Sequence, residues 1–426
     1  MPILRFEMAA FRNLSFLVFV FCVLISLKNQ NAETKKGSFG ISSFSSSPTK
    51  PASIFSDLLS KQAVLLSTED EEVVNRKMLT VSGSGSLEYD FYRKSCPAAE
   101  KIIRDAVREL CKSRPRLGPA LVRLVFHDCF IEGCDASVLL DGVEGMRSEK
   151  DSLPNESLKG FDAIDIIKSK LEEMCPGVVS CADILVLAAR EAVILAGGPF
   201  YPLNTGRRDS TVAYSDMATY ELPSPHADVS ETLASFASRG FDERETVSLL
   251  GSHSTGITHC RFFKNRLYNF DGSGQPDPTL DSGFLNLLRS KCDNTLPSRS
   301  SAPSASLTGS TLPFNTSLLS AAAEAPSIDR LSSSPEDEEE VMDMNYGEPA
   351  AEFGTVYYRH LLQGKGLLFA DQQLMAGEET RIWVRAYASD PFLFRRDFAL
   401  VMMRLSNLRV LTAPRGQIRH NCSKVA

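Results

Sequence analysis

The sequence predicts a mostly α-helical domain with few, short strands. Three observations predict this fold class. Several segments carry apolar residues at helical spacing, and two segments begin with the Asp-x-x-Glu pattern of a helix capping box. No segment shows sustained alternation of apolar and polar residues, which a half-buried strand would require. We therefore expect one disulfide-linked helical domain.

The N-terminal region is predicted to precede this domain. Residues 14–27 are almost purely apolar and follow Arg5 and Arg12, which is typical of a signal peptide at 1–32. An apolar run of this length is too short to span a bilayer comfortably, and an uncleaved signal anchor is the alternative. Residues 33–86 are rich in Ser, Lys and Glu and are expected to be a disordered extension. The folded domain is then expected at 87–426.

The central helix of the domain is predicted at residues 180–196. This segment is almost entirely apolar and is stopped by Gly197-Gly198-Pro199. A helix that is apolar on every side, within a water-soluble domain, belongs at the centre. An amphipathic helix is expected before it, at 162–174.

Clear start signals mark the later helices. Asp228 with Glu231 and Asp242 with Glu245 form capping boxes, and the second helix is expected to run through Leu249 to His253. Asp390-Pro391 is a typical start for the last long helix. Residues 293–342, by contrast, are rich in Ser, Ala and Pro, end in an acidic run and are expected to be a surface loop.

Composition limits the functional classes. The net charge of −7 argues against binding to a nucleic-acid backbone. Ten cysteines are present, and Cys22 lies in the N-terminal apolar run. With a targeting signal in front, the other nine favour a disulfide framework with one cysteine left over, although spacing alone does not identify the pairs.

Residues 121–141, LVRLVFHDCFIEGCDASVLLD, carry the densest chemistry of the chain. Arg123 and His127 stand four residues apart and share one helical face. A cation beside an imidazole suits a site where a proton moves while negative charge develops. Asp128, Asp135 and Ser137 follow on a short loop, and such hard oxygen donors suit calcium. The alternative for Arg123 and His127 alone is an ordinary surface or hydrogen-bonded pair.

Two segments together resemble the secreted plant haem peroxidases, also called class III. The segment R-L-V-F-H-D-C-F-I-E-G-C-D-A-S-V-L-L-D resembles their distal haem motif, and D-E-R-E-T-V-S-L-L-G-S-H-S-T-G-I-T-H-C resembles their proximal helix. Further matching pieces arrive in the family's order between residues 89 and 422: S-E-K-D-S-L-P-N-E-S-L-K-G-F, V-V-S-C-A-D-I-L, G-R-R-D-S, L-Y-N-F with P-D-P-T-L-D, and G-Q-I-R-H-N-C.

The resemblance implies a haem peroxidase fold, with a b-type haem between the distal and proximal helices. His253 would hold the iron, and Asp371 would accept the Nδ1 proton of His253. His127 would move the proton of hydrogen peroxide, and Arg123 would stabilise the developing negative charge. Small phenolic donors would then be oxidised in two one-electron steps.

Other residues take supporting roles by the same resemblance. Asn155 would accept a hydrogen bond from His127 and fix its tautomer; it also begins a glycosylation sequon, and burial would leave it unmodified. Phe126 would cover the haem edge, and Pro223 would lie at the substrate opening.

The resemblance also implies calcium sites. A distal ion would be held by Asp128, Asp135 and Ser137 through side chains, by Ile131 and Gly133 through carbonyls, and by Glu149 through water. On the proximal side, Ser254 keeps a hydroxyl and Asp343 is a doubtful ligand in an uncertain register. Gly354 stands where the family has an aspartate. We therefore predict a divergent member whose second calcium site is weak or absent.

The resemblance implies four disulfides: Cys96–Cys175, Cys129–Cys134, Cys181–Cys422 and Cys260–Cys292. Cys111 is then the odd cysteine. The implied protein is a secreted monomer of the extracellular space or cell wall, with the vacuole as an alternative, and with no nucleic-acid partner and no membrane for the mature chain.

Two other functions remain open at this point. A secreted protein of the same fold that acts by binding in the cell wall, without catalysis, is the main alternative. A zinc hydrolase using His127 and His253 is weaker, because no third ligand stands at a recognisable spacing.

Overall fold

The computed structural model describes residues 87–292, 340–346 and 353–426, all within one compact unit, Arg76–Ala426. The signal peptide at 1–32, the extension at 33–86 and nearly all of the loop at 293–342 lie outside the described residues and stay predictions. None of the described helices is both long enough and apolar enough to traverse a bilayer.

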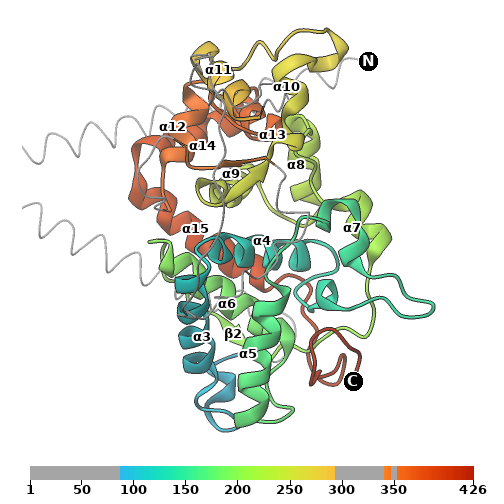
Figure 1. The fold of residues 1–426 in the computed structure, drawn as a ribbon. Coiled ribbons are helices and arrows are strands. Elements are labelled where there is room, and N and C mark those ends of the chain that lie inside the picture. Colours follow the sequence, from blue (N-terminus) through green and yellow to red (C-terminus); the bar gives the residue numbers. More distant parts are fainter. Residues whose placement is uncertain (1–86, 293–339, 347–352) are drawn as a thin grey trace, which may run out of the picture. The chain divides into compact units, whose positions relative to one another are not determined.

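The described residues form 13 α-helices and four short strands, which confirms the mostly α fold class (Figure 1). The helices of the first half are α3 Ala99–Ser113, α4 Leu117–Phe130, α5 Phe161–Met174, α6 Cys181–Leu195, α7 Ser215–Glu221, α8 Val229–Ser238 and α9 Glu243–Leu250. Those of the second half are α10 Lys264–Tyr268, α11 Ser282–Cys292, α12 Val356–Leu362, α13 Phe369–Gln373, α14 Glu378–Ser389 and α15 Pro391–Ser406.

Helix α6 is the centre of the core, as its composition predicts. Every residue from Cys181 to Val193 is buried, and the helix packs against α3, α4 and α5. Its first turn is capped by the Ser180 side chain, which accepts a hydrogen bond from the backbone of Asp183. In Figure 1, α4 lies between this group and the group that contains α9 and α12–α14.

Helices α8 and α9 both begin with complete capping boxes, at Asp228 with Glu231 and at Asp242 with Glu245. The expected helix to His253 is partly wrong, because α9 ends at Leu250 and a single 3₁₀ turn, Gly251–Ser254, follows. A Cβ atom at Gly251 would lie about 2.6 Å from Phe394. The glycine therefore allows a close approach between α9 and α15 at the point where the α-helix passes into the 3₁₀ turn.

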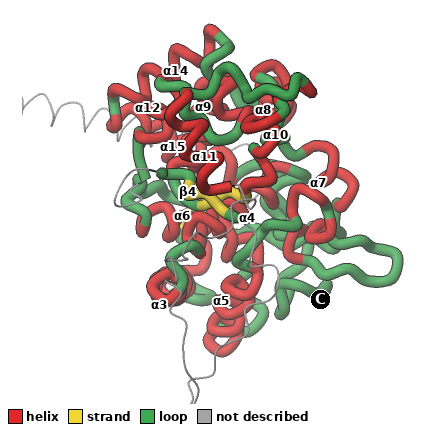
Figure 2. Tube along the Cα trace, turned by 45° about the horizontal axis from the view of Figure 1, so that its top comes forward, coloured by secondary structure: helices red, strands yellow, loops and turns green. Residues whose placement is uncertain are grey.

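The strands form two small antiparallel pairs. β1 Glu88–Tyr89 pairs with β2 Asn204–Thr205, and β3 Ile257–His259 pairs with β4 Val341–Asp343. Figure 2 shows small yellow strand pieces at the label β4, among the helices. The β3–β4 pair holds the segment after His253 against residues that are more than 80 positions later in the sequence.

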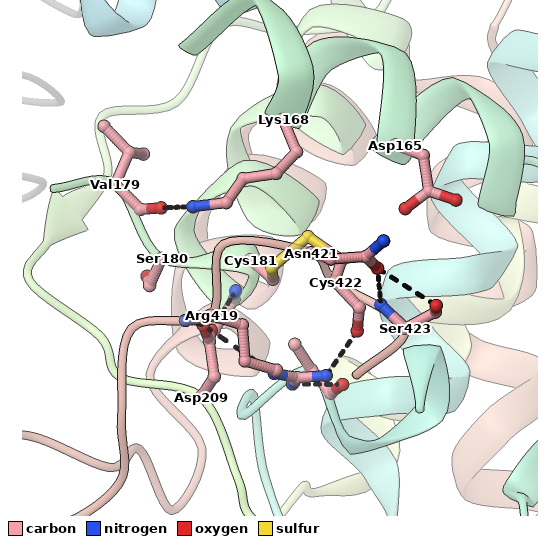
Figure 3. The surroundings of a disulfide bond; sticks show 12 residues. Asp165, Lys168, Val179, Ser180, Cys181, Asp209, Arg419, Asn421, Cys422 and Ser423 are labelled. Carbon is pink, nitrogen blue, oxygen red and sulfur yellow. Dashed lines mark hydrogen bonds and ion pairs between the residues drawn. A yellow bond between two sulfur atoms is a disulfide. The ribbon is translucent and has the colours of Figure 1, made fainter. Parts of the chain in front are cut away.

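Four disulfides tie the described segments together, and they are the pairs that the resemblance implies: Cys96–Cys175, Cys129–Cys134, Cys181–Cys422 and Cys260–Cys292. Cys111 is the free cysteine among the described residues. The Cys181–Cys422 bond joins the start of α6 to the C-terminal segment across 241 positions of sequence (Figure 3).

Candidate active site

The distal pair lies on α4, where four-residue spacing puts Arg123 and His127 on one face. The Nδ1 atom of His127 donates to Oδ1 of Asn155 at 2.6 Å, and Nδ2 of Asn155 donates to the carbonyl of Glu149 at 2.9 Å. Because the amide nitrogen of Asn155 is already a donor, its oxygen must accept. His127 therefore carries its proton on Nδ1 and keeps Nε2 free to accept another.

The charge states of this pair follow from burial. Burial lowers the pKa of His127 well below its usual value, the positive charge of Arg123 lowers it further, and the bond to Asn155 only partly opposes them. Burial also lowers the pKa of Arg123 to about 10, with a further contribution from Arg261. At neutral pH the site thus holds a neutral imidazole beside a cation.

Two neighbours orient the distal residues. The guanidinium of Arg123 donates to the carbonyl of Pro154 at 2.9 Å, which ties it to the turn that carries Asn155. The half-buried ring of Phe126 lies 4.8 Å from Phe130 and 5.9 Å from Phe236, centroid to centroid.

The proximal histidine is held by a buried carboxylate. Nδ1 of His253 contacts Oδ1 of Asp371 at 2.8 Å, and Asp371 lies on α13, 118 positions away in the sequence. Tyr357, from α12, donates its hydroxyl to the same oxygen at 2.9 Å. Sequence reasoning missed this tyrosine, because no local pattern places its hydroxyl near Asp371.

The charge of Arg123 affects the pKa of His253 as well as that of His127. Burial lowers the pKa of His253, but the Asp371 carboxylate more than offsets this, so the pKa lies above its usual value; the charge of Arg123 acts in the opposite direction. The two residues are therefore close enough to interact. Because Asp371 occupies Nδ1, Nε2 of His253 is the atom left for a metal.

These residues fit a haem. Haem iron needs one histidine whose second nitrogen is held by a hydrogen-bond acceptor, and His253 with Asp371 meets this requirement. About a third of the His253 side chain is exposed, while Asp371 behind it is buried. The accessible imidazole and the buried carboxylate have the arrangement that iron ligation needs.

The segment from the end of α4 to Ser137, together with Glu149, is called the distal loop here, and it contains buried oxygens that lack partners. Asp128, Asp135, Ser137 and Glu149 are all buried. Oδ1 of Asp128, Oγ of Ser137 and Oε2 of Glu149 have no hydrogen-bond partner among the described residues. Buried unpaired oxygens are costly unless a cation or water satisfies them, and this donor set fits calcium. Ile131 and Gly133 lie in the same loop, and Gly133 has a φ of 115°.

Burial raises the pKa of each of these carboxyl groups in the absence of an ion. The pKa of Glu149 rises to about 7 and that of Asp135 to about 6. The pKa of Asp128 is raised well above its usual value by burial and by the charges of Asp135 and Glu149. Three acidic groups gathered at one buried loop are a strong electrostatic reason to bind a divalent cation.

The proximal loop offers a weaker donor set. Oγ of Ser254 is buried without a partner among the described residues, but Asp343 is exposed on β4. Asn345, which sequence reasoning missed, is buried with both amide atoms unpaired in the described part of the chain. Gly354 supplies no side-chain oxygen. Pro223 is half-buried, and its contact with a substrate stays a prediction.

Taken together, an imidazole and a guanidinium on one helix and a carboxylate-bound imidazole on another define the class of haem-dependent oxidoreductases. A family model described as peroxidase matches residues 103–390. The chain is 57% identical over 341 residues to Putative Peroxidase 48 of Arabidopsis thaliana, covering 79% of this chain and 82% of that protein. It is 39% identical over 350 residues to Peroxidase N of Armoracia rusticana, covering 81% and 93%, and 39% identical over 342 residues to Peroxidase 10 of Arabidopsis thaliana, covering 80% and 86%.

The chain belongs to the peroxidase family, and it is a haem peroxidase enzyme. The comparisons do not favour the non-catalytic alternative.

Proposed function

We propose that this chain reduces hydrogen peroxide with His127 and Arg123 on one side of a haem that His253 holds, and that small phenolic compounds are its donors. One observation carries the proposal. Two imidazoles are each fixed through Nδ1, by Asn155 and by Asp371, and the charge of Arg123 acts on both. Each imidazole therefore keeps Nε2 for the reaction.

The haem, when bound, supplies the redox chemistry that accepts electrons from the donor and passes them to peroxide. His253 would hold the group through Nε2, and the buried Asp371 would make that nitrogen a stronger donor. Tyr357 shares the carboxylate oxygen and so limits how strongly Asp371 acts on His253.

On the distal side, Nε2 of neutral His127 would take a proton from one oxygen of hydrogen peroxide and return it to the other oxygen, which leaves as water. Arg123 stabilises the negative charge that develops while the O–O bond breaks. Two donor molecules each give up one electron and one proton, and the second oxygen leaves as water. One peroxide and two donors are thus converted into two waters and two one-electron-oxidised donors.

We also propose one tightly held calcium ion, at the distal loop. Asp128, Asp135, Ser137 and Glu149 support it, with the carbonyls of Ile131 and Gly133. The second site is proposed to be weak or absent, because Gly354 replaces a carboxylate and Asp343 is exposed. Calcium measured per haem tests both statements: one ion is expected, and two tightly held ions would contradict the loss of the second site.

Secretion into the extracellular space or cell wall as a monomer completes the proposal. Four disulfides persist in oxidising compartments and are rare in the cytosol, which supports this location. Buried Asn155 is held at both ends of its amide, so its sequon is expected to stay unmodified.

The decisive experiment is guaiacol oxidation by hydrogen peroxide on haem-loaded protein, with His127→Ala as the matched control. The wild type is expected to be faster by at least about a hundredfold, the usual contribution of a positioned proton carrier. Equal rates, with an unchanged Soret band in both proteins, would refute the proposed role of His127.

A further inference from the structure

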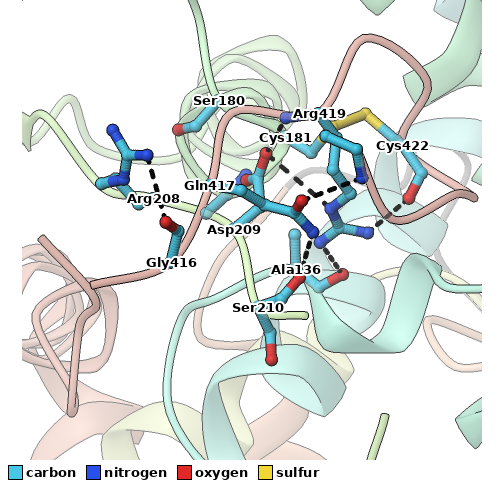
Figure 4. Close-up of polar contacts among 12 residues, drawn as sticks. Ala136, Ser180, Cys181, Arg208, Asp209, Ser210, Gly416, Gln417, Arg419 and Cys422 are labelled. Atoms are coloured by element: carbon cyan, nitrogen blue, oxygen red, sulfur yellow. Dashed lines mark hydrogen bonds and ion pairs between the residues drawn. A yellow bond between two sulfur atoms is a disulfide. The ribbon is translucent and has the colours of Figure 1, made fainter. Parts of the chain in front are cut away.

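Arg419 is a fully buried cation in the C-terminal segment, and it contacts the distal calcium loop. Its Nη2 atom donates to the carbonyl of Ala136 at 2.7 Å and to that of Asp135 at 3.4 Å. Its Nη1 atom donates to the carbonyl of Cys422 at 2.5 Å. Figure 4 shows the guanidinium between the loop and the end of the chain. One side chain thus joins two segments 283 positions apart.

Asp209 fixes the opposite side of Arg419. Oδ2 of Asp209 accepts from the backbone nitrogen of Arg419 at 3.0 Å and lies 3.8 Å from Nε of the guanidinium. Oδ1 of Asp209 accepts from the backbone of Ala182, in the first turn of α6. The adjacent residue Cys181 forms the disulfide to Cys422 (Figure 3). Arg419 is therefore anchored both by a buried carboxylate and by a covalent bond three residues away.

The part of the loop that Arg419 holds has a strained backbone. Ala136 has a φ of 58°, in the left-handed region that costs a residue with a side chain about 1 kcal/mol. Its neighbours Asp135 and Ser137 are the expected calcium ligands, and its own nitrogen donates to Oδ2 of Asp128 at 3.1 Å. The turn at Ala136 therefore sets the direction of both neighbouring side chains. The bonds from Arg419 to carbonyls 135 and 136 act on this turn from outside the ligand set.

We propose that Arg419 is a positioning residue for the distal calcium ion. It supplies no ligand atom. Its guanidinium holds the left-handed turn that aims Asp135 and Ser137, while the Cys181–Cys422 disulfide holds Arg419 in place. The calcium affinity of this protein therefore depends on a segment near its C-terminus. Binding linkage is reciprocal, so calcium in turn stabilises the contacts of this segment. The inference rests on the proposed distal calcium site.

The test compares the calcium affinity of haem-loaded, disulfide-bonded full chains, measured by competition with a chelating dye. Arg419→Met keeps the length of the side chain and removes its charge and all its donors. Its dissociation constant is expected to rise about tenfold or more, since hydrogen bonds from a charged group are lost. Arg419→Lys keeps the charge with fewer directed donors and is expected to lie between Arg419→Met and the wild type.

Arg208→Met is the matched control. The guanidinium of Arg208 donates to the carbonyl of Gly416 at 3.1 Å, so it bonds the same C-terminal segment at a different point (Figure 4). If the role of Arg419 is only structural, each variant lowers the melting temperature by the same amount with calcium as without it. A positioning role instead reduces the stabilisation that calcium gives, in Arg419→Met and not in Arg208→Met.

Hydrogen exchange of the wild type supplies a test that needs no variant. The backbone N–H of Arg419, bonded to Asp209, is expected to exchange more slowly when calcium is present. The inference would be overturned, without affecting the proposed calcium site, if folded Arg419→Met bound calcium as tightly as the wild type. It would also be overturned if hydrogen exchange at Arg419 were the same with and without calcium. If the wild type itself binds no calcium, the proposed distal site fails first and the inference fails with it.

Discussion

Calcium binding to the distal loop is expected to release protons at mildly acidic pH. The perturbation is a change of pH from about 8 to about 6 in calcium-free protein. Burial raises the pKa of Glu149 to about 7 and that of Asp135 to about 6. A cation binds the deprotonated carboxylates, so any proton present on them must leave when calcium enters.

The size of the effect follows from these two pKa values. At about pH 6, Asp135 is about half protonated and Glu149 about nine-tenths protonated, so binding releases about 1.4 protons. At about pH 8 the release from these two groups falls to about 0.1 proton. Integrated between the two conditions, the calcium dissociation constant tightens about twentyfold as the pH rises. Protons on Asp128, whose pKa is also raised, add to this effect.

The same groups make the stability of calcium-free protein depend on pH. Their pKa values are higher in the folded chain than in the unfolded chain, so their contribution to stability is complete at low pH and is lost as the pH rises. For Glu149 the loss occurs between about pH 4.5 and about pH 7. Without calcium, the melting temperature is therefore expected to fall as the pH rises across this range. With calcium bound, it is expected to stay nearly constant.

Isothermal titration calorimetry in two buffers of different ionisation enthalpy measures the released protons directly. Glu149→Gln is the matched variant, because it keeps the size of the side chain and removes the group with the higher of the two pKa values. At about pH 6 it is expected to release about 0.9 proton fewer than the wild type, because the proton on Glu149 is no longer there to leave. Equal heats in both buffers at about pH 6 would refute the reasoning, because the carboxylates would then be charged before the ion arrives.

Three further predictions concern the residues around the two histidines. Asn155→Val removes the acceptor of His127 Nδ1 and is expected to slow the reaction with peroxide at least about tenfold, measured by stopped flow; an unchanged rate constant would exclude the proposed role of Asn155. Tyr357→Phe removes a hydrogen bond to a buried carboxylate and is expected to lower the free energy of unfolding by about 1.5–3 kcal/mol. Tyr358→Phe removes a hydrogen bond to the Val247 carbonyl and should lower it by about 1 kcal/mol. Equal midpoints of denaturant unfolding for the two variants would contradict this. Gly251→Ala places a methyl group against Phe394 and is expected to lower the free energy of unfolding by about 1–3 kcal/mol and to weaken haem retention. Gly118→Ala, with its nearest neighbours 3.9 Å away, should be neutral or stabilising by up to about 1 kcal/mol. Similar thermal melting curves for the two variants would contradict the predicted clash at Gly251.

Local features of the fold could be predicted from the sequence, because their causes are local. Each capping box, at Asp228 and at Asp242, involves only four consecutive residues, and the structure contains both boxes. The central position of α6 follows from its largely apolar composition. The end of α9 could not be predicted in the same way. Its change to a 3₁₀ turn accompanies a close approach at Gly251 by Tyr358 and Phe394, which stand more than a hundred residues later.

Contacts between distant segments required the family resemblance or the structure. Spacing identifies the shared face of Arg123 and His127, but nothing local connects His253 to Asp371, and the resemblance alone supplied that pair. The roles of Tyr357 and Arg419 were missed by both routes, although Arg419 stands in the matching piece G-Q-I-R-H-N-C. A buried tyrosine on an apolar helical face and an arginine near a chain end look ordinary in sequence, and only the folded chain brings them to Asp371 and to the loop at Ala136.

The calcium loop and the distal base are joined at two points, and this gives the loop a mechanistic role. Asp128 follows His127 directly in α4. Glu149 contributes a carboxylate to the loop, while its backbone carbonyl accepts from the amide of Asn155, which in turn accepts from His127. A calcium ion bound at this loop would therefore act on the helix that carries the imidazole and also on the residue that sets its tautomer. Since Arg419 contacts the same loop from the C-terminal side, the proposed calcium site would connect the orientation of Nε2 in His127 to a segment near the end of the chain.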